Sequence, residues 1–514
     1  MKTFASLLIV VILLALAVPM AAQDSLTLEV LGSYSHGAFD EGAAEIAAFH
    51  APSATLYVVN GDSDTIDLLD ISDPAAIALK SQIDVTAYGD SAQSVAVSGD
   101  VVAVAIAADP AQDPGFVVFF DVDGNFTSSV TVGALPDMVT FTPDGTKALS
   151  ANEGEPDDDY VIDPVGSVSI IDLSGGVENL TDDAVTTIDF EGVEIPEDVR
   201  IFGPGATPAQ DLEPEYIAVS PDGSTAYVTL QENNAVGVID IESASAVAVV
   251  ALGFKDHSLP GNELDAGKDD GMVNIANWPL FGMYQPDAIA AYEVDGEVYL
   301  VTANEGDARD YDGYSEEGEI GETEIDPDFP GLDDLLTEET ILGFEIVNSL
   351  GDTDGDGDLD ELYANGARSF SIWNSAGELV SDSGSDFERI TGELYPDDFN
   401  SSNDENGDLD GRSDNKGPEP EGVVLGEIDG ATYAFVCLER IGGVMVYDIS
   451  DPMAPVYVTY VNNRDFSGDA EAGTAGDLGP EGLVFISADD SPTGGNLLVV
   501  TNEVSGTTTI FAVN

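Results

Sequence analysis

Basic residues and cysteine are the scarcest features of this 514-residue chain. It has 13 Lys and Arg against 99 Asp and Glu, which gives a formal net charge of −86 at pH 7. Nucleic acid and anionic membrane surfaces repel such a chain, so both are disfavoured as partners. The single cysteine, Cys437, cannot form an intramolecular disulfide, so core burial or bound ions must stabilise the fold. Because Cys437 stands in an apolar run, we predict a buried thiol and no catalytic one.

Long apolar runs are also scarce, and the one clear run covers residues 7–18. Lys2 precedes it, and the small residues Ala21 and Ala22 follow it, which is typical of an export signal spanning residues 1–22. The run is short for a membrane span, and an uncleaved N-terminal anchor is the alternative. We therefore expect a secreted protein, extracellular or periplasmic, with no membrane span after signal cleavage.

The acidic residues are spread through a chain that is 43% hydrophobic, which indicates a folded protein and excludes a disordered acidic tail. Self-repulsion of this size destabilises a compact state unless cations screen it. Two compatible explanations stay open: a saline habitat, and specific binding of divalent cations.

Seven repeats follow one another along the chain. Each opens with an acidic residue, usually after proline, and continues with an alternating strand, a turn that is often Asp-Gly, an almost wholly apolar second strand, a third strand and a weaker fourth. The openings are 44–45, 92–93 (the one without an acid), 136–137, 214–215, 286–287, 420–421 and 480–481. The second strands are 56–60, 101–106, 148–152, 226–230, 298–304, 433–438 and 497–502. The third strands are 65–72, 116–123, 167–174, 235–242, 368–374, 443–450 and 507–514.

The two ends of the chain suggest how the repeats close. The seventh repeat stops after its third strand, at Asn514, and an unassigned strand at 26–31 precedes the first repeat. This strand can complete the last repeat and so protect both edges of a ring. The predicted fold is all-β: a monomeric, single-domain seven-bladed β-propeller over residues 23–514, with four-stranded blades.

Strand direction places the carboxylates. First and second strands run antiparallel, so the start of one and the end of the other meet at one mouth of a central channel. Carboxylates begin six first strands (Glu45, Asp137, Glu215, Asp287, Glu421 and Glu481) and follow five second strands (Glu153, Glu232, Glu305, Glu439 and Glu503). Long loops suit a binding site, and the long insertions fall on this same face: 192–213, 254–285, 306–366, 390–419 and 462–479.

Several scarce residues fall in these loops and suggest chemistry. We predict channel-mouth metal ligands among Glu153, Glu215, Asp287, Glu305, Glu421 and Glu481. Lys255, Arg309 and Arg440 are candidates to hold an anionic substrate, and His36 or His257 to donate a proton. The alternative is that these cations only neutralise the acidic face.

Residues 352–360 have the spacing of a calcium-binding loop. Asp352, Asp354 and Asp356 stand at its positions 1, 3 and 5, Gly357 supplies the turn, and Asp358 and Asp360 add oxygens. Tyr363 stands where the bidentate Glu of an EF-hand belongs, so we expect Ca²⁺ without an EF-hand; a solvated acidic turn is the alternative. A second cluster of acidic residues, with looser spacing, lies at 404–411 and is a weaker candidate for calcium. We expect calcium to order insertions that have no core of their own.

Several motifs resemble those of the choice-of-anchor I family of exported bacterial proteins, which includes sequences labelled mesenchyme-specific cell surface glycoprotein. They are 34–40 (YSHGAFD), 151–156 (ANEGEP), 254–262 (FKDHSLPGN), 277–279 (NWP), 285–287 (QPD), 303–311 (ANEGDARDY) and 417–422 (GPEPEG). The resemblance implies a propeller displayed outside the cell on varied C-terminal anchors, although this chain ends directly after its last strand. Some relatives carry an alkaline-phosphatase label.

Two functions follow from these features. The first is an extracellular or cell-surface binding module that calcium stabilises and that performs no chemistry. The second is a metal-dependent phosphoester hydrolase, similar to propeller alkaline phosphatases and phytases, acting on an anionic small molecule at the acidic mouth. Motifs for serine hydrolases, zinc proteases and nucleotide cofactors are missing. We favour the binding module.

Overall fold

Seven four-stranded antiparallel sheets hold most strands of the described chain, residues 26–267, 270–336 and 341–514 of a computed structural model. The export-signal prediction for residues 1–22 lies outside the described residues. The first four sheets are β2–β5 (Ala47–His50, Thr55–Asn60, Thr65–Asp70, Ala78–Asp84), β6–β9 (Ala92–Ser98, Val101–Ile106, Pro114–Asp121, Phe126–Ala134), β10–β13 (Pro136–Phe141, Lys147–Asn152, Ser167–Asp172, Val185–Ile188) and β14–β17 (Pro214–Val219, Thr225–Leu230, Ala235–Asp240, Ser245–Ala251).

The remaining three sheets also have four antiparallel strands, but in the last one the fourth strand is the N-terminal strand β1. They are β20-β21-β27-β28 (Ile289–Val294, Glu297–Asn304, Ser369–Asn374, Leu379–Asp382), β29–β32 (Pro420–Ile428, Ala431–Leu438, Val444–Asp448, Val456–Val461) and β33-β34-β35-β1 (Pro480–Ile486, Asn496–Asn502, Thr507–Val513, Leu28–Ser35). In the last sheet the N-terminal strand β1 pairs antiparallel with β35, from Leu28 opposite Val513 to Ser35 opposite Thr507. The predicted partner of the N-terminal strand is therefore the observed one.

Local sequence explains the hairpins. Asp295-Gly296 and Asp429-Gly430 join first to second strands with positive φ at both residues, as a two-residue hairpin requires. The second strands that follow are almost wholly apolar because neighbouring sheets cover both of their faces; β3, for example, is buried at every position.

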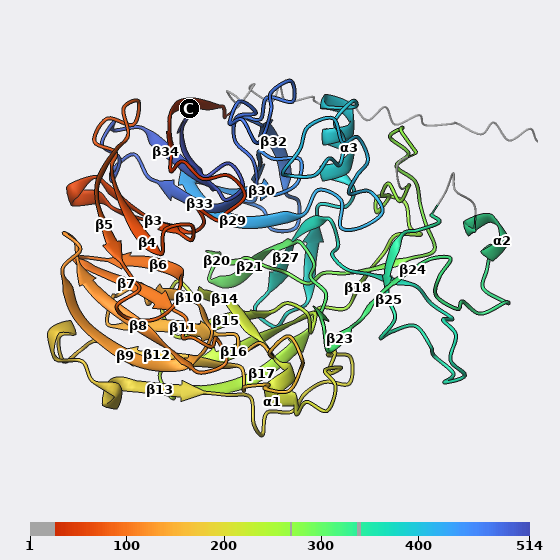
Figure 1. The fold of residues 1–514 in the computed structure, drawn as a ribbon, viewed down its shortest axis with the longest axis horizontal. Coiled ribbons are helices and arrows are strands. Elements are labelled where there is room, and N and C mark those ends of the chain that lie inside the picture. Colours follow the sequence, from red (N-terminus) through yellow and green to blue (C-terminus); the bar gives the residue numbers. More distant parts are fainter. Residues whose placement is uncertain (1–25, 268–269, 337–340) are drawn as a thin grey trace, which may run out of the picture.

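The first strands of the sheets contact one another in chain order. Contacts join β2 to β6, β6 to β10, β10 to β14, β14 to β20, β20 to β29, β29 to β33 and β33 to β2. Figure 1 shows the sheets arranged around a common centre, with β6, β10, β14, β20, β29 and β33 near the middle of the view. The N-terminal ends of the seven first strands, which we call the openings of the sheets, are thereby brought close together.

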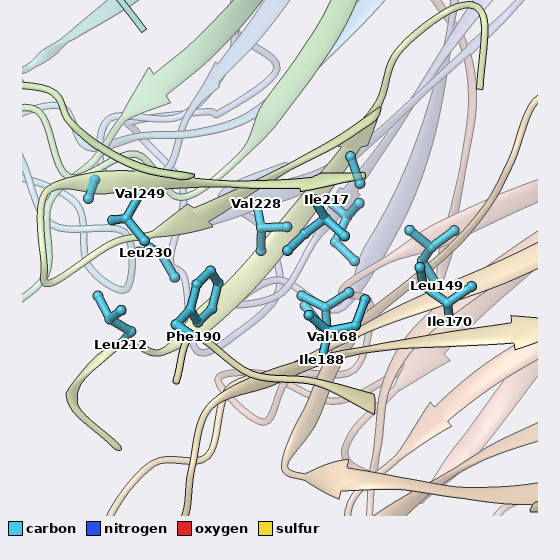
Figure 2. Close-up of a cluster of buried hydrophobic side chains, with 14 of the residues drawn as sticks. Leu149, Val168, Ile170, Ile188, Phe190, Leu212, Ile217, Val228, Leu230 and Val249 are labelled. Carbon is cyan, nitrogen blue, oxygen red and sulfur yellow. The ribbon is translucent and has the colours of Figure 1, made fainter. Parts of the chain in front are cut away.

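Apolar side chains fill the spaces between neighbouring sheets. Figure 2 shows one such cluster, in which Val168 and Ile188 of the β10–β13 sheet face Ile217 and Val228 of the β14–β17 sheet, with Phe190 alongside. This packing fixes the relative position of the two sheets, and so of the residues at their ends.

Two of the insertions share a core of their own, contrary to our expectation. Segments 254–285 and 306–366 pack around buried Leu264, Trp278, Phe344, Ile346 and Leu359. Short strands organise them: β18 (Phe254–Asp256), β19 (Phe281–Met283) and β26 (Tyr363–Ala364) form one sheet, while β22 (Asp310–Tyr311) pairs with β23 (Tyr314–Ser315) and β24 (Glu317–Glu319) with β25 (Glu345–Val347). The apolar residues are too widely spaced in the sequence to show strand or helix periodicity, which is why the sequence did not reveal this core.

Helices are few and short. They are α1 (Pro208–Asp211), α2 (Leu332–Leu335), α3 (Asp386–Leu394) and the 3₁₀ turns Ala51–Ser53, Val177–Asn179 and Asp182–Ala184. We did not predict α3, which buries Phe387 and Ile390 against the β20-β21-β27-β28 and β29–β32 sheets. Within residues 26–267, 270–336 and 341–514, no helix has the length and apolar character needed to cross a membrane.

Candidate cation-binding face

A β-bulge at a Pro-acid pair opens the first strand of four sheets. Each proline pairs with the last residue of the second strand, and the register then shifts before pairing resumes, at Pro136, Pro214, Pro420 and Pro480. Proline is tolerated as the first residue of a strand, and a bulge takes the next residue out of the regular alternation. The bulged residues include the carboxylates Asp137, Glu215, Glu421 and Glu481. The repeated sequence pair thus places an acid at the same point of each sheet.

These openings meet at a cavity of about 140 Å³. Its lining comes from the start of every one of the seven sheets: Ile46, Ala47, Gln93, Ser94, Asp137, Met138, Tyr216, Asp287, Glu421, Gly422, Val423, Glu481, Gly482 and Leu483. Four of the six predicted strand-start carboxylates therefore line one cavity, as strand direction suggested.

The carboxylates that follow the second strands lie beside them and form two groups. Glu153, Glu215 and Glu232 each offer an oxygen within 4.8 Å of the other two, and so do Glu305, Glu421 and Glu439. Carboxylate oxygens at this spacing can hold a hard divalent cation. Glu153, Glu215, Glu305 and Glu421 were predicted ligands, whereas Asp287 and Glu481 line the cavity outside both groups.

Burial and mutual repulsion make full ionisation of these acids costly. Burial, with the charges of Glu503 and Asp137, raises the pKa of Glu45 to about 8. Burial and Glu155 raise the pKa of Asp137 to about 7, and burial raises that of Glu232 to about 7 in spite of the charge of Arg309.

Glu419 is the exception, and its role was not predicted from the sequence. Its carboxylate forms ion pairs with Lys416 (3.2 Å), Arg412 (2.7 Å) and Arg440 (2.9 Å). Burial alone would raise the pKa of Glu419, but these three cations lower it to about 2. Lys416 also reaches Glu305 at 2.7 Å, and Arg440 reaches Glu439 at 3.0 Å. The tandem Pro-Glu pairs at 418–421 were the available signal for this residue.

Arg309 is a buried link between two insertions. It is 1% exposed, its Nη1 donates to Asp211, and its Nη2 donates to the Asp211 carbonyl oxygen and lies 2.7 Å from Glu213. Its guanidinium also stacks over the ring of Phe202, 4.5 Å from the centroid. Because its donors are already engaged, this geometry favours neutralisation of the acidic face over binding of an anionic substrate. Arg440, whose side chain is 23% exposed, keeps more access to solvent.

Lys255 and His257 lie in the insertion that carries β18, and neither forms a hydrogen bond or ion pair with the two carboxylate groups among the described residues. Lys255 Nζ donates to the carbonyl oxygens of Ala367 and Gly384 and lies 3.1 Å from Asp382. His257 Nδ1 donates to the Asn262 carbonyl oxygen, and burial together with the charge of Lys255 lowers the pKa of His257 to about 3.

His36 is also enclosed. Its Nδ1 lies 2.7 Å from Asp67 Oδ2 on β4, and its Nε2 lies 3.0 Å from the hydroxyl of Thr508 on β35. Its side chain is fully buried, so the residue joins the first and last sheets at their interface. The structure therefore does not bring either predicted proton donor to the cavity lining.

The acidic loop at 352–360 divides into two carboxylate groups. Asp352, Asp354 and Asp356 form one, exposed to solvent. Asp358 and Asp360 form the other together with Asp326, which a parallel bridge between Ile325 and Leu359 brings alongside. Partial desolvation, together with the hydrogen bond and the charge of Asp356, raises the pKa of Asp358 to about 6. Asp326 was missed because it lies in a different part of the insertion, and no local spacing links it to the loop.

A guanidinium occupies the looser cluster at 404–411. Arg464 donates to Asn406 Oδ1 at 2.9 Å, to the Ser402 carbonyl oxygen at 2.8 Å and to the Glu405 carbonyl oxygen at 2.5 Å. This cluster does not bring three carboxylates together in the described chain. An internal cation thus holds the loop that we had considered for calcium.

The fold and the site define an all-β protein of four-stranded antiparallel sheets whose openings gather carboxylates at one cavity. The chain belongs to the choice-of-anchor I domain family, whose profile matches residues 45–452. This confirms the resemblance seen in the sequence motifs.

Two named relatives share part of the sequence. Gigasin-3a of Magallana gigas is 31% identical over 189 residues, 35% of this chain and 66% of that protein. The mesenchyme-specific cell surface glycoprotein of Strongylocentrotus purpuratus is 27% identical over 286 residues, 48% of this chain and 36% of that protein. The chain thus spans less than two thirds of the length of either relative.

Three solved structures align with most of the chain at low sequence identity. Hydrazine synthase of Kuenenia stuttgartiensis has 14% identity and a TM-score of 0.48, covering 93% of this chain and 99% of that one. Streptogramin B lyase has 10% identity and a TM-score of 0.47, covering 96% and 100%. The Cps50 (Swd1) β-propeller domain of Myceliophteria thermophila has 9% identity and a TM-score of 0.43, covering 95% and 100%.

Proposed function

We propose that this chain is a secreted, calcium-binding, seven-bladed β-propeller that serves as an extracellular binding module. The observation that carries the proposal is the gathering of carboxylates from separate sheets at one cavity, on a rigid all-β scaffold. A concave, charged site on such a scaffold suits recognition of a ligand. An acidic face of this kind takes cations directly, or takes anions through a bound metal ion.

A closed ring is part of this proposal. The contacts between first strands run from β2 through the other sheets and back to β2, and β1 supplies the outer strand beside β35. His36 adds a buried polar link between β35 and β4. If the ring is closed in this way, deletion of residues 26–35 exposes the edge of β35. The expected result is a protein that melts at a lower temperature and self-associates, whereas the intact chain elutes as a monomer.

Surface or extracellular placement is supported by family membership and by the Strongylocentrotus purpuratus relative, which is a cell surface glycoprotein. The export signal predicted at residues 1–22 agrees with this placement. Appearance of the chain in the medium or at the cell surface, with residues 1–22 removed, is the direct measurement; retention in the cytoplasm would contradict the proposal.

Calcium is proposed for the loop at 352–360. Two observations support it. The loop carries two groups of carboxylates, one with Asp354 and one with Asp358, and the backbone amides of Gly355 and Gly357 donate hydrogen bonds to Asp352. Because the insertion has its own apolar core, we propose that calcium supplements that core by neutralising the loop charges.

A phosphoester hydrolase is the second candidate. One observation favours it: Lys416 and Arg440 lie beside the group formed by Glu305, Glu421 and Glu439, as an anion site next to a metal would require. The burial of His36 and His257 counts against it, because neither of the predicted proton donors lies at the cavity.

The discriminating experiment is hydrolysis of p-nitrophenyl phosphate by purified residues 23–514, with calcium and then with a chelator. The binding module predicts no chelator-sensitive turnover and a melting temperature that calcium raises. Turnover that the chelator removes, and that Arg440→Ala abolishes while exposed Arg389→Ala does not, would establish the hydrolase instead.

A further inference from the structure

The two carboxylate groups at the openings differ in their counter-ions. Lys416 and Arg440 pair directly with Glu305 and Glu439 in the second group, at 2.7 and 3.0 Å. No Lys or Arg side chain forms an ion pair with Glu153, Glu215 or Glu232 in the described chain. The protein therefore supplies its own cations to one group, and no comparable cation to the other.

The nearest guanidiniums do not remove this difference. Arg309 is engaged by Asp211 and Glu213, two carboxylates for one positive charge. Arg200 donates to the backbone carbonyl oxygen of Glu232 and pairs with Glu316, which leaves the Glu232 carboxylate unpaired. Neither arginine therefore forms an ion pair with the group, although the charge of Arg309 partly offsets the effect of burial on the pKa of Glu232.

Two buried oxygens of the first group are also unsatisfied. Glu215 is 7% exposed and Glu232 is 4% exposed, yet Oε2 of each has no hydrogen-bond partner within the described residues. An unpaired buried carboxylate is costly, and the cost is relieved by a proton or by a bound cation. Both acids belong to the set whose oxygens lie within 4.8 Å of one another.

We propose that Glu153, Glu215 and Glu232 bind one hard divalent cation of the calcium type at the junction of the β10–β13 and β14–β17 sheets. Glu153 follows β11, Glu215 lies in the bulge of β14 and Glu232 follows β15, so three separate segments supply the ligands. The donor atoms are all carboxylate oxygens, which suit calcium and give no preference to zinc or copper.

The surrounding packing holds these ligands in place. The apolar cluster of Figure 2 fills the space between the same two sheets, and it includes Ala151 and Leu230, each two residues before a ligand. The site therefore needs little ordering on binding. It is separate from the loop at 352–360 and stands independently of the proposed function, because either could fail alone.

The test uses residues 23–514 stripped of metal with EDTA, with Ca²⁺ as the probe. Equilibrium dialysis against ⁴⁵Ca²⁺ in 0.1 M NaCl gives the number of ions bound per chain. We expect Glu215→Gln/Glu232→Gln to bind one ion fewer than the wild type. Glu305→Gln/Glu439→Gln is the matched control: it changes the same residue types in the group that has its own cations, and it should bind as many ions as the wild type.

A second readout shows whether the variants fold. Saturating calcium is expected to raise the melting temperature of the wild type by about 2–5 °C through this site, a shift that Glu215→Gln/Glu232→Gln loses. In EDTA this variant should melt no lower than the wild type, because glutamine removes repulsion between buried charges. The control variant should melt lower in both buffers, since Lys416 and Arg440 lose partners.

Two outcomes would overturn the site. One is an unchanged number of bound ions in Glu215→Gln/Glu232→Gln, which would mean that protons satisfy the group. The other is loss of all calcium binding in Asp354→Asn/Asp356→Asn, which would assign every ion to the loop. If instead that loop variant binds as many ions as the wild type, the loop proposal fails and the Glu215 site stands.

Discussion

Replacement of Arg309 with methionine tests whether this residue stabilises the fold or holds a ligand. The side chain is 1% exposed and links the insertion at 306–366 to Asp211 and Glu213 of the insertion at 192–213. Methionine keeps much of the volume and the contact with Phe202 but removes the charge and every donor. Asp211 and Glu213 are then left buried without their cation.

The expected cost follows from that burial. Removing one partner of a buried ion pair typically destabilises a protein by about 3–5 kcal/mol, because the remaining charge is unpaired in a poorly hydrated site. Arg309→Lys should cost less, since a single ammonium keeps the charge and loses the forked geometry. At pH 5 the cost of Arg309→Met should shrink, because the orphaned Glu213 can then take up a proton.

Urea unfolding followed by circular dichroism is the appropriate assay, since guanidinium chloride would screen the electrostatic effect under study. Arg389→Ala is the control: Arg389 pairs with Asp386 at 2.6 Å but its side chain is 56% exposed, so a change of about 0–0.5 kcal/mol is expected. If Arg309→Met lowered the free energy of unfolding no more than Arg389→Ala, the stabilising role of Arg309 would be refuted. A role in holding an anionic substrate would then regain support.

Three further predictions concern ionisable groups. Glu45→Gln should stabilise the protein by up to about 4 kcal/mol at pH 8 and by little at pH 4.5, because the raised folded-state pKa of Glu45, about 8, makes wild-type stability fall as pH rises from 4.5; equal pH profiles in calcium-free urea titrations would contradict this. His257→Gln should lessen the loss of stability on acidification from pH 6.5 towards 3, because the unfolded chain protonates His257 in that range and the folded chain does not. This is seen as a shallower dependence of the urea midpoint on pH, and an unchanged slope would show that His257 becomes charged in the folded protein. Cys437 should react with Ellman's reagent only after unfolding, because the thiol is buried and its pKa is well above the usual range; rapid reaction of the native protein would refute its burial.

The repeated elements could be predicted from the sequence because each rests on a local rule. Alternation, Asp-Gly turns and Pro-acid pairs located the strands of each sheet and placed Asp137, Asp287, Glu421 and Glu481 at one end. Antiparallel pairing then sufficed to bring Glu153 and Glu232 to that end. The sequence also suggested the partner of the N-terminal strand.

Elements that depend on distant contacts could not be predicted. Glu419 acquires its role from three cations, of which Arg440 lies on another segment, and Asp326 reaches Asp358 only through a bridge inside the insertion. The enclosure of His257 depends on the apolar core of the insertion. Scarcity of a residue type, which drew attention to the histidines and arginines, did not distinguish a ligand-binding cation from an internal counter-ion.

The pairing of β1 with β35 has a consequence for the order of folding. Thr27 and Asn514 exchange both backbone hydrogen bonds, so strands at opposite ends of the described chain meet in one sheet. Strand β1 leaves the ribosome long before β35 and waits without its partner until β35 is made, while six sheets can already assemble from neighbouring segments. Loop closure over nearly the whole chain makes this final step slow. During that interval the unpaired edges of β1 and β35 are the strand edges most exposed to misassociation.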